Sequence, residues 1–134
     1  MFTWKEITVP TKSREELVDI THQVAEAVAE AKVANGVCYL YVPHTTAAVT
    51  INENADPDVG SDLINGLKRL APAQAGYRHA EGNSDAHIKA SLVGFSGIVP
   101  IVGGRLALGT WQGIYFWEFD GPRTRKMLIG LAGE

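Results

Sequence analysis

The final third of the chain carries only β-strand signals, and this feature constrains the fold more than any other. Runs of β-branched and aromatic residues lie at 98–102, 106–108, 114–119 and 125–131. Gly103 with Gly104 is typical of a two-residue hairpin, and Gly121 with Pro122 is typical of a turn. A meander of antiparallel strands is expected, because no helical pattern separates these runs to carry a parallel crossover.

The first part of the chain mixes strands with helices. Residues 2–9 predict a strand that ends at Pro10. Ser13 and Glu16 match a capping box, and apolar residues then recur at helical spacing. A helix is therefore expected to begin at Ser13 and to end before Gly36.

Two short strands and two more helices complete the pattern. The strands are expected at 36–42 and 47–51. Asp56 and Pro57 predict the N-cap and first residue of a second helix, and Ser84 is predicted to cap a third. This order of strands and helices indicates an α+β fold. Its sheet is expected to be antiparallel or mixed and β-sandwich-like, with about three helices packed on one side.

The composition is typical of one globular domain spanning residues 1–134. Of the 134 residues, 46% are hydrophobic and 20% are charged, which excludes a mainly disordered chain. The formal net charge of −3 provides no general positive field, so no nucleic-acid partner is expected. An anionic ligand would have to be held by a local cluster of donors.

Three features indicate a cytoplasmic protein that does not enter a membrane. Cys38 is the only cysteine, so it cannot form an internal disulfide bond, and it fits a reducing compartment. The first residues lack the basic and then apolar pattern of a secretion signal. No run approaches the roughly 18 apolar residues of a membrane span.

Polar residues crowd around the strand expected at 47–51. His44 and Thr45 precede this strand, and Asn52 and Glu53 follow it. Buried polar groups each need a partner, so a binding or catalytic site explains the crowding better than a simple turn does. The alternative for His44 is an ordinary exposed loop residue.

Two further histidines lie between residues 77 and 89. His79 is in a glycine-containing connection, and His87 falls in the first turn of a helix, where the positive helix end disfavours a charged imidazole. Together with His44 they could supply three nitrogen ligands to a divalent metal ion, which would keep a fourth coordination position open for water or substrate. Their spacing matches no local metal motif, and three unrelated loop histidines remain the alternative.

The stretch from 108 to 125 adds aromatic and basic candidates. Trp111 and Gln112 stand in a turn where a ring and an amide could bind a heteroaromatic ligand. The alternative is that Trp111 plugs the end of the core.

Two arginines follow the turn at 121–122. Arg123 and Arg125 can pair with the carboxylates of Glu118 and Asp120 or with an anionic substrate, and the ion pairs are the default expectation.

Together these stretches resemble the YjbQ-like family of small proteins, described as secondary thiamine-phosphate synthases. The resemblance runs nearly end to end. It rests on HTTAAVTINENADPD at 44–58, EGNSDAHIKASLVG at 81–94, VPIVGGRLALGTWQGIYFWEFDGPR at 99–123 and the isolated His79. It implies an α+β fold of β-sandwich character, assembly as a homotrimer, and a divalent metal ion, possibly zinc or magnesium, near the histidines.

The resemblance also implies a set of site residues. The expected metal or catalytic group is His44, His79 and His87, with Glu53 as a further catalytic residue. The expected substrate-binding residues are Thr45, Asn52, Asn83, Trp111, Gln112 and Arg123.

The implied reaction joins a pyrimidine methyl pyrophosphate to a thiazole phosphate and releases pyrophosphate. One alternative is a metal-dependent hydrolase of a phosphate ester or another small polar substrate, with Glu53 as the base. Another is a non-catalytic trimeric protein that binds a metabolite. In each case the expected partner is a small phosphorylated or heteroaromatic molecule.

Overall fold

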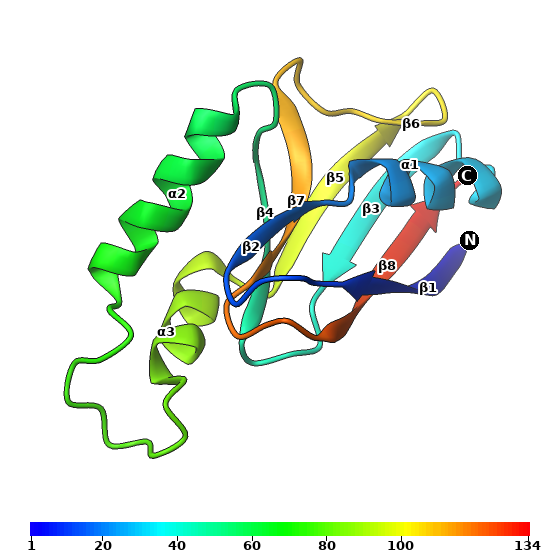
Figure 1. The fold of residues 1–134 in the computed structure, drawn as a ribbon. Coiled ribbons are helices and arrows are strands. Elements are labelled where there is room, and N and C mark those ends of the chain that lie inside the picture. Colours follow the sequence, from blue (N-terminus) through cyan, green and yellow to red (C-terminus); the bar gives the residue numbers. More distant parts are fainter.

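The computed structural model describes residues 1–134 as two antiparallel sheets and three helices (Figure 1). One sheet has five strands in the order β1-β8-β3-β5-β6, and the other has three in the order β2-β7-β4. The strands are β1 (Phe2–Pro10), β2 (Glu16–Asp19), β3 (Asn35–Tyr41), β4 (Ala47–Glu53), β5 (Ser96–Val102), β6 (Arg105–Leu106), β7 (Gln112–Glu118) and β8 (Thr124–Gly133). The helices are α1 (Thr21–Ala31), α2 (Pro57–Leu70) and α3 (Ser84–Val93). The expected α+β sandwich is confirmed.

The main core lies between the two sheets, because alternate residues of each strand point inward and are apolar. Leu40 and Ile129 of the five-stranded sheet belong to one buried cluster with Val49 and Phe116 of the three-stranded sheet. Val24 of α1 joins the same cluster, and α1 contacts strands of both sheets. Each such side chain contributes about 1.5–3 kcal/mol by leaving water.

Helices α2 and α3 lie together on the outer side of the three-stranded sheet (Figure 1). Ala86 and Ala90 of α3 pack with Trp117 and Phe119 in a second, smaller core. Small alanine side chains let α3 approach the sheet closely. Helix α2 is held less firmly, since none of its residues is fully buried.

The first helix begins later than the sequence pattern predicts, and the capping box at Ser13 is wrong. Residues 16–19 form β2, in which Leu17 lies opposite Trp117 of β7, and α1 starts at Thr21. The side chain of Glu16 accepts a hydrogen bond from the backbone N–H of Lys12 (2.8 Å). Pairing with β7 gives the backbone of residues 16–19 hydrogen-bond partners in the sheet, which replace those of a helical turn.

The outward face of the five-stranded sheet is uncovered and rich in aromatic residues. Phe2, Trp4, Tyr39 and Tyr41 are between 38% and 54% exposed. The ring centroid of Phe2 lies 5.2 Å from that of Trp4 and 6.1 Å from that of Tyr39. Gly130 makes room for this cluster, because a Cβ atom there would lie 2.7 Å from the Trp4 ring. Apolar surface of this kind commonly marks a contact surface.

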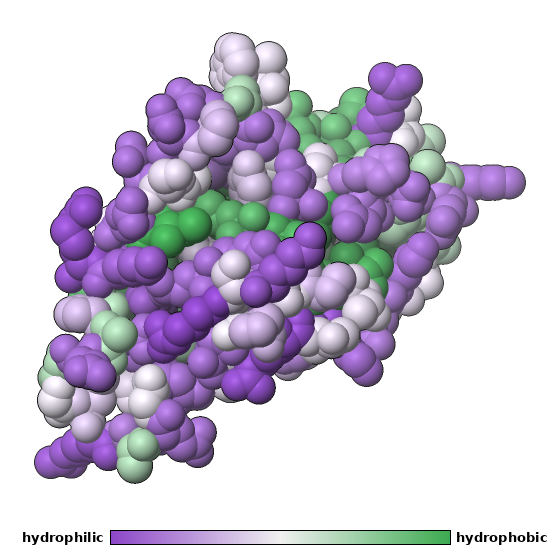
Figure 2. Space-filling view, in the orientation of Figure 1, coloured by the Kyte–Doolittle hydropathy of each residue, from purple (hydrophilic) through white to green (hydrophobic).

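The side of the molecule drawn in Figure 2 is mostly polar, with a band of hydrophobic residues across its middle. None of the three helices has the length and apolar character needed to cross a membrane.

Candidate functional site

Three segments that are distant in the sequence meet at one end of the three-stranded sheet. They are the β3–β4 connection, the residues leading into α3, and the β7–β8 connection. Between them lies a hollow of about 400 Å³. The residues lining this polar hollow are Pro43, His44, Thr45, Thr46, Glu81, Asn83, His87, Asp120, Arg123 and Arg125.

A buried ion pair lies at the inner side of the polar hollow. Arg125 is 5% exposed and Glu118 is 0% exposed. Arg125 donates from Nε to Glu118 Oε1 (2.8 Å) and from Nη2 to Glu118 Oε2 and to the Thr46 hydroxyl (2.9 Å). Its Nη1 makes no hydrogen bond within the chain, so it remains available to a ligand.

Glu118 is held in its charged form by its neighbours. Burial alone would raise the pKa of this carboxyl group, because it disfavours the charge. Hydrogen bonds from Arg125, from the backbone N–H of Asp120 and from the Thr11 hydroxyl outweigh burial, so the pKa lies below its ordinary value. The guanidinium of Arg125 therefore keeps a charged, rigid partner.

Arg123 and Asn83 are both anchored to Asp120. Arg123 donates from Nε to the Asp120 carbonyl oxygen (2.8 Å) and from Nη2 to Oδ2 (3.0 Å). Asn83 donates from Nδ2 to the same Oδ2 (2.8 Å), while its own Oδ1 is buried without a partner. The expected pairing of both arginines with Glu118 and Asp120 is therefore present. A ligand that carries a donor group could satisfy the unpaired Asn83 oxygen.

The start of α3 borders the polar hollow through Asn83 and His87. The expected capping by Ser84 is wrong, because the N-cap residue is Asn83 and Ser84 is already helical. The Asn83 side chain makes no capping hydrogen bond, since its amide is bound to Asp120. The backbone N–H groups of Ala86 and His87 donate to the Asn83 carbonyl oxygen (3.0 and 3.4 Å), so this carbonyl closes the first turn of α3.

A second buried ion network fixes α3 on the sheet. Asp85 and Lys89 are 0% and 1% exposed, and the Lys89 ammonium donates to Asp85 (2.8 Å) and to Glu15. Arg14 holds the same carboxylate with two hydrogen bonds of 3.0 and 3.2 Å. Burial raises the pKa of Asp85, but Arg14 and Lys89 lower it more, so it falls below its ordinary value.

The structure places the three candidate histidines in one region but in different settings. His44 and His87 both line the polar hollow. His79 is exposed, and its ring centroid lies 5.5 Å from that of His87 in an edge-to-face arrangement. The Nε2 atom of His44 accepts a hydrogen bond from the backbone N–H of Lys126 (2.9 Å).

The histidines do not form a metal centre within one chain. No group of three or more histidine, cysteine, aspartate or glutamate residues is arranged to hold a metal ion. One candidate nitrogen, Nε2 of His44, is occupied by the Lys126 N–H. The residues present therefore do not fit the implied three-nitrogen site.

The remaining predicted site residues lie at the opposite end of the β4–β7 pair. Gln112 of β7 is paired with Glu53 of β4, whereas Glu118 at the other end is paired with Ala47. Six strand steps separate these ends, which is about 20 Å. Trp111, next to Gln112, is 63% exposed, and Asn52 is also exposed.

Sequence reasoning anticipated that Arg125 pairs with a carboxylate, but it missed that the Arg125–Glu118 pair is buried and that Arg125 also donates to Thr46. The signal was present in the alternation of β8, where residue 125 shares the inward face with Met127 and Ile129. In β7, Glu118 shares the inward face with Phe116. Opposite charges at two core-facing positions indicate a buried pair.

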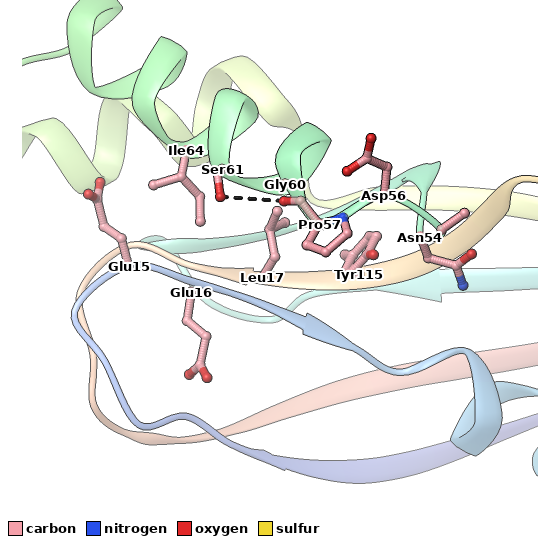
Figure 3. Close-up of a pocket in the computed structure, with 11 residues that line it drawn as sticks. Glu15, Glu16, Leu17, Asn54, Asp56, Pro57, Gly60, Ser61, Ile64 and Tyr115 are labelled. Atoms are coloured by element: carbon pink, nitrogen blue, oxygen red, sulfur yellow. Dashed lines mark hydrogen bonds between the residues drawn. The ribbon is translucent and has the colours of Figure 1, made fainter.

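Another hollow, of about 430 Å³, lies beneath the start of α2 (Figure 3). Its lining includes Glu15, Glu16 and Asp56, together with Tyr115. It contains no basic residue and none of the predicted site residues. The hollow beneath α2 therefore offers an anion no positively charged side chain, unlike the polar hollow.

The structure is that of a small α+β sandwich protein with a polar hollow at one end of its three-stranded sheet. Residues 5–134 match the family described as UPF0047 protein YjbQ-like, and the chain belongs to this family. A UPF0047 protein of Methanocaldococcus jannaschii is 55% identical over 126 residues, covering 94% of this chain and 91% of that protein. The UPF0047 protein YugU of Bacillus subtilis is 48% identical, covering 96% and 98%.

Solved structures of this family have the same fold. A YjbQ/UPF0047 family protein of Clostridium acetobutylicum is 50% identical, with a TM-score of 0.94, over 96% of this chain and 99% of that one. A YbjQ-like protein of Sulfolobus solfataricus is 34% identical, with a TM-score of 0.96, over 100% and 99%.

Proposed function

We propose that the polar hollow binds the phosphate groups of a small substrate in a thiamine-phosphate synthase-like transferase. The observation that supports this proposal most directly is the presence of two arginines, Arg123 and Arg125, in the lining of one polar hollow. Guanidinium groups are donors that proteins commonly use for phosphate. Asp120 and Glu118 already hold the arginines in place, so binding requires little reorganisation.

The reaction needs a site that stabilises a leaving pyrophosphate. The thiazole nitrogen forms a bond to the methylene carbon of the pyrimidine, and the bond from that carbon to the pyrophosphate oxygen breaks. The electron pair leaves with pyrophosphate, whose negative charge increases during the step. Positive groups fixed beforehand, such as Arg125 with its unused Nη1, lower the barrier of such a step.

A divalent ion, zinc or magnesium, stays a prediction. One chain alone does not present three suitable ligands. His79 and His87 would need further ligands from a bound phosphate or from another subunit.

A homotrimer would explain how the predicted site residues at the far end of the β4–β7 pair, the end opposite the polar hollow, could still take part in the site. Within one chain, Trp111, Gln112, Asn52 and Glu53 lie too far away to touch a ligand in the polar hollow. The exposed aromatic face around Trp4 and Tyr39 supports assembly, because it leaves a large apolar area in water. In an assembly, Trp111 of one subunit could stack on a pyrimidine held by another.

The test is an assay of the purified protein with the pyrimidine methyl pyrophosphate, with and without the thiazole phosphate. Release of pyrophosphate that depends on the thiazole phosphate, together with the joined product, is the expected result. Release without the thiazole phosphate would instead identify a hydrolase. Binding without release would identify a metabolite-binding protein.

A further inference from the structure

The hydrogen bond between His44 and Lys126 determines where the imidazole proton lies. The backbone N–H of Lys126 can only donate, and it reaches Nε2 of His44 at 2.9 Å. Nε2 must therefore present a lone pair. A neutral imidazole carries one proton, so that proton resides on Nδ1.

The surroundings of His44 favour this neutral form. The ring is half-buried and lines the polar hollow together with Arg123 and Arg125. Burial lowers the pKa of His44, and the positive charge of Arg125 lowers it further. The negative charge of Glu118 acts in the opposite direction but does not cancel these effects.

We infer that His44 serves the polar hollow as a fixed hydrogen-bond donor through Nδ1–H, aimed at an anionic ligand oxygen, and that it does not bind a metal through Nε2. This inference rests on the proposed function, because it assumes an anionic group in the polar hollow. It replaces the metal-ligand role expected from the sequence. It also makes His44 a residue that recognises the ligand.

The chemistry of a neutral donor differs from that of a proton shuttle. If Nδ1–H were transferred to the ligand while Nε2 still accepted from Lys126, the ring would become an imidazolate, which is far too basic to persist. His44 therefore keeps its proton and stabilises negative charge by hydrogen bonding alone. A neutral imidazole used in this way polarises an oxygen atom without adding a charge to the site.

The tautomer can be read directly by NMR on the natural chain labelled with ¹⁵N. A two-bond ¹H–¹⁵N correlation spectrum distinguishes protonated from unprotonated ring nitrogens, and loss of one signal set in His44→Asn assigns the ring. We expect Nδ1 to be protonated and Nε2 to be unprotonated. A ring with its proton on Nε2, or one that shifts at Nε2 on addition of Zn²⁺ as a coordinated nitrogen does, would overturn the inference.

Inorganic pyrophosphate then tests the donor role. We expect it to shift the Nδ1 signals of His44 and to leave Nε2 nearly unchanged. Binding that moves no His44 signal would overturn the donor role alone. An absence of any pyrophosphate binding by the natural chain would overturn both the donor role and the proposed function.

Two variants separate the two sides of the ring. In His44→Gln the side-chain oxygen can still accept from Lys126 but the Nδ1–H donor is lost, so we expect about tenfold weaker pyrophosphate binding by calorimetry. In His44→Asn the amide can replace the Nδ1–H donor, so we expect a smaller loss. The matched control is His22→Gln on α1, where the side chain is 82% exposed and affinity should not change. Equal affinities of the natural chain and His44→Gln would contradict the inference.

Discussion

The two ends of the β4–β7 strand pair carry similar polar residue types but hold them in opposite ways. At the end near α3, Glu118 and Arg125 are buried and joined by several hydrogen bonds. At the far end, Asn52 accepts a hydrogen bond from its neighbour Glu53, and Gln112 accepts one from Gly109, three residues away. At the first end the side chains that join distant segments are buried and charged, whereas at the far end the bond from Asn54 N–H to the Trp111 carbonyl oxygen joins backbone groups.

This difference supports the proposal that the end near α3 holds a charged ligand. Burying two ions costs about as much free energy as their attraction returns, so such a pair is weak support for stability alone. Its effect here is to fix the guanidinium of Arg125 at the polar hollow. The far end keeps its side chains in water, where they remain free to rearrange or to meet another subunit.

The largest expected effect comes from breaking the buried pair. Glu118→Gln removes the charge that faces Arg125 and leaves the guanidinium buried without a counter-ion. We expect the free energy of unfolding to fall by about 3–5 kcal/mol, measured by urea denaturation followed by tryptophan fluorescence. Glu53→Gln, the matched change at the far end, should cost less than about 1 kcal/mol. Similar losses in the two variants would contradict the contrast between the ends.

The next effect is the loss of stability in acid. Glu118 and Asp85 have lowered pKa values, so near their unfolded pKa of about 4 the unfolded chain binds more protons than the folded chain. Their contribution is fully present above that pKa and is lost as the pH falls toward the folded pKa values. Urea midpoints should therefore decline below about pH 5.

Glu118→Gln sharpens this pH test, because it removes one of the two groups. Its urea midpoint should start lower at neutral pH but decline less steeply on acidification. An equal decline in the natural chain and in Glu118→Gln would show that Glu118 contributes nothing to acid sensitivity.

A smaller effect is expected for ligand binding at the rim of the polar hollow. Arg123 has a side chain that is 53% exposed, and it is held by Asp120 alone. Arg123→Gln should weaken pyrophosphate binding about tenfold while changing stability by less than about 1 kcal/mol. Calorimetry measures the affinity, and Arg105→Gln, an exposed arginine outside the polar hollow, is the charge-matched control. An equal loss in both variants would indicate a general charge effect.

Most of the fold could be predicted because the periodicity and turn residues agree with the final packing. The hairpin at Gly103 and Gly104 and the start of α2 at Pro57 follow local rules, and both are present. Strand β2 could not be predicted, because residues 13–19 also fit a helical pattern. Its pairing with β7 depends on a strand nearly a hundred residues away.

The candidate site could be predicted only in part. Local composition identified His44 and Arg123, and the family resemblance added Asn83; the fold brings all three together at the polar hollow. The family resemblance implies that Trp111 and Gln112 belong to the same site as Arg123. Strand β7 runs between Gln112 and the turn that precedes Arg123, however, and its two ends are about 20 Å apart.

The smallest expected effect on stability is that of Trp111→Ala, which tests whether the far end of the β4–β7 pair takes part in the site. Trp111 is 63% exposed, so Trp111→Ala should change the free energy of unfolding by no more than about 0.5 kcal/mol. A loss of transferase activity in this stable variant would mean that Trp111 contacts the substrate in a polar hollow. Because Trp111 is too far from the polar hollow of its own chain, this hollow would have to belong to another subunit. Co-expression of Trp111→Ala with His44→Ala should then restore about a quarter of the activity. In random assembly, about a quarter of the shared sites combine a natural His44 from one subunit with a natural Trp111 from the next. Full activity of Trp111→Ala alone would remove the far end from the site, whereas inactivity without recovery on co-expression would argue against a site shared between subunits.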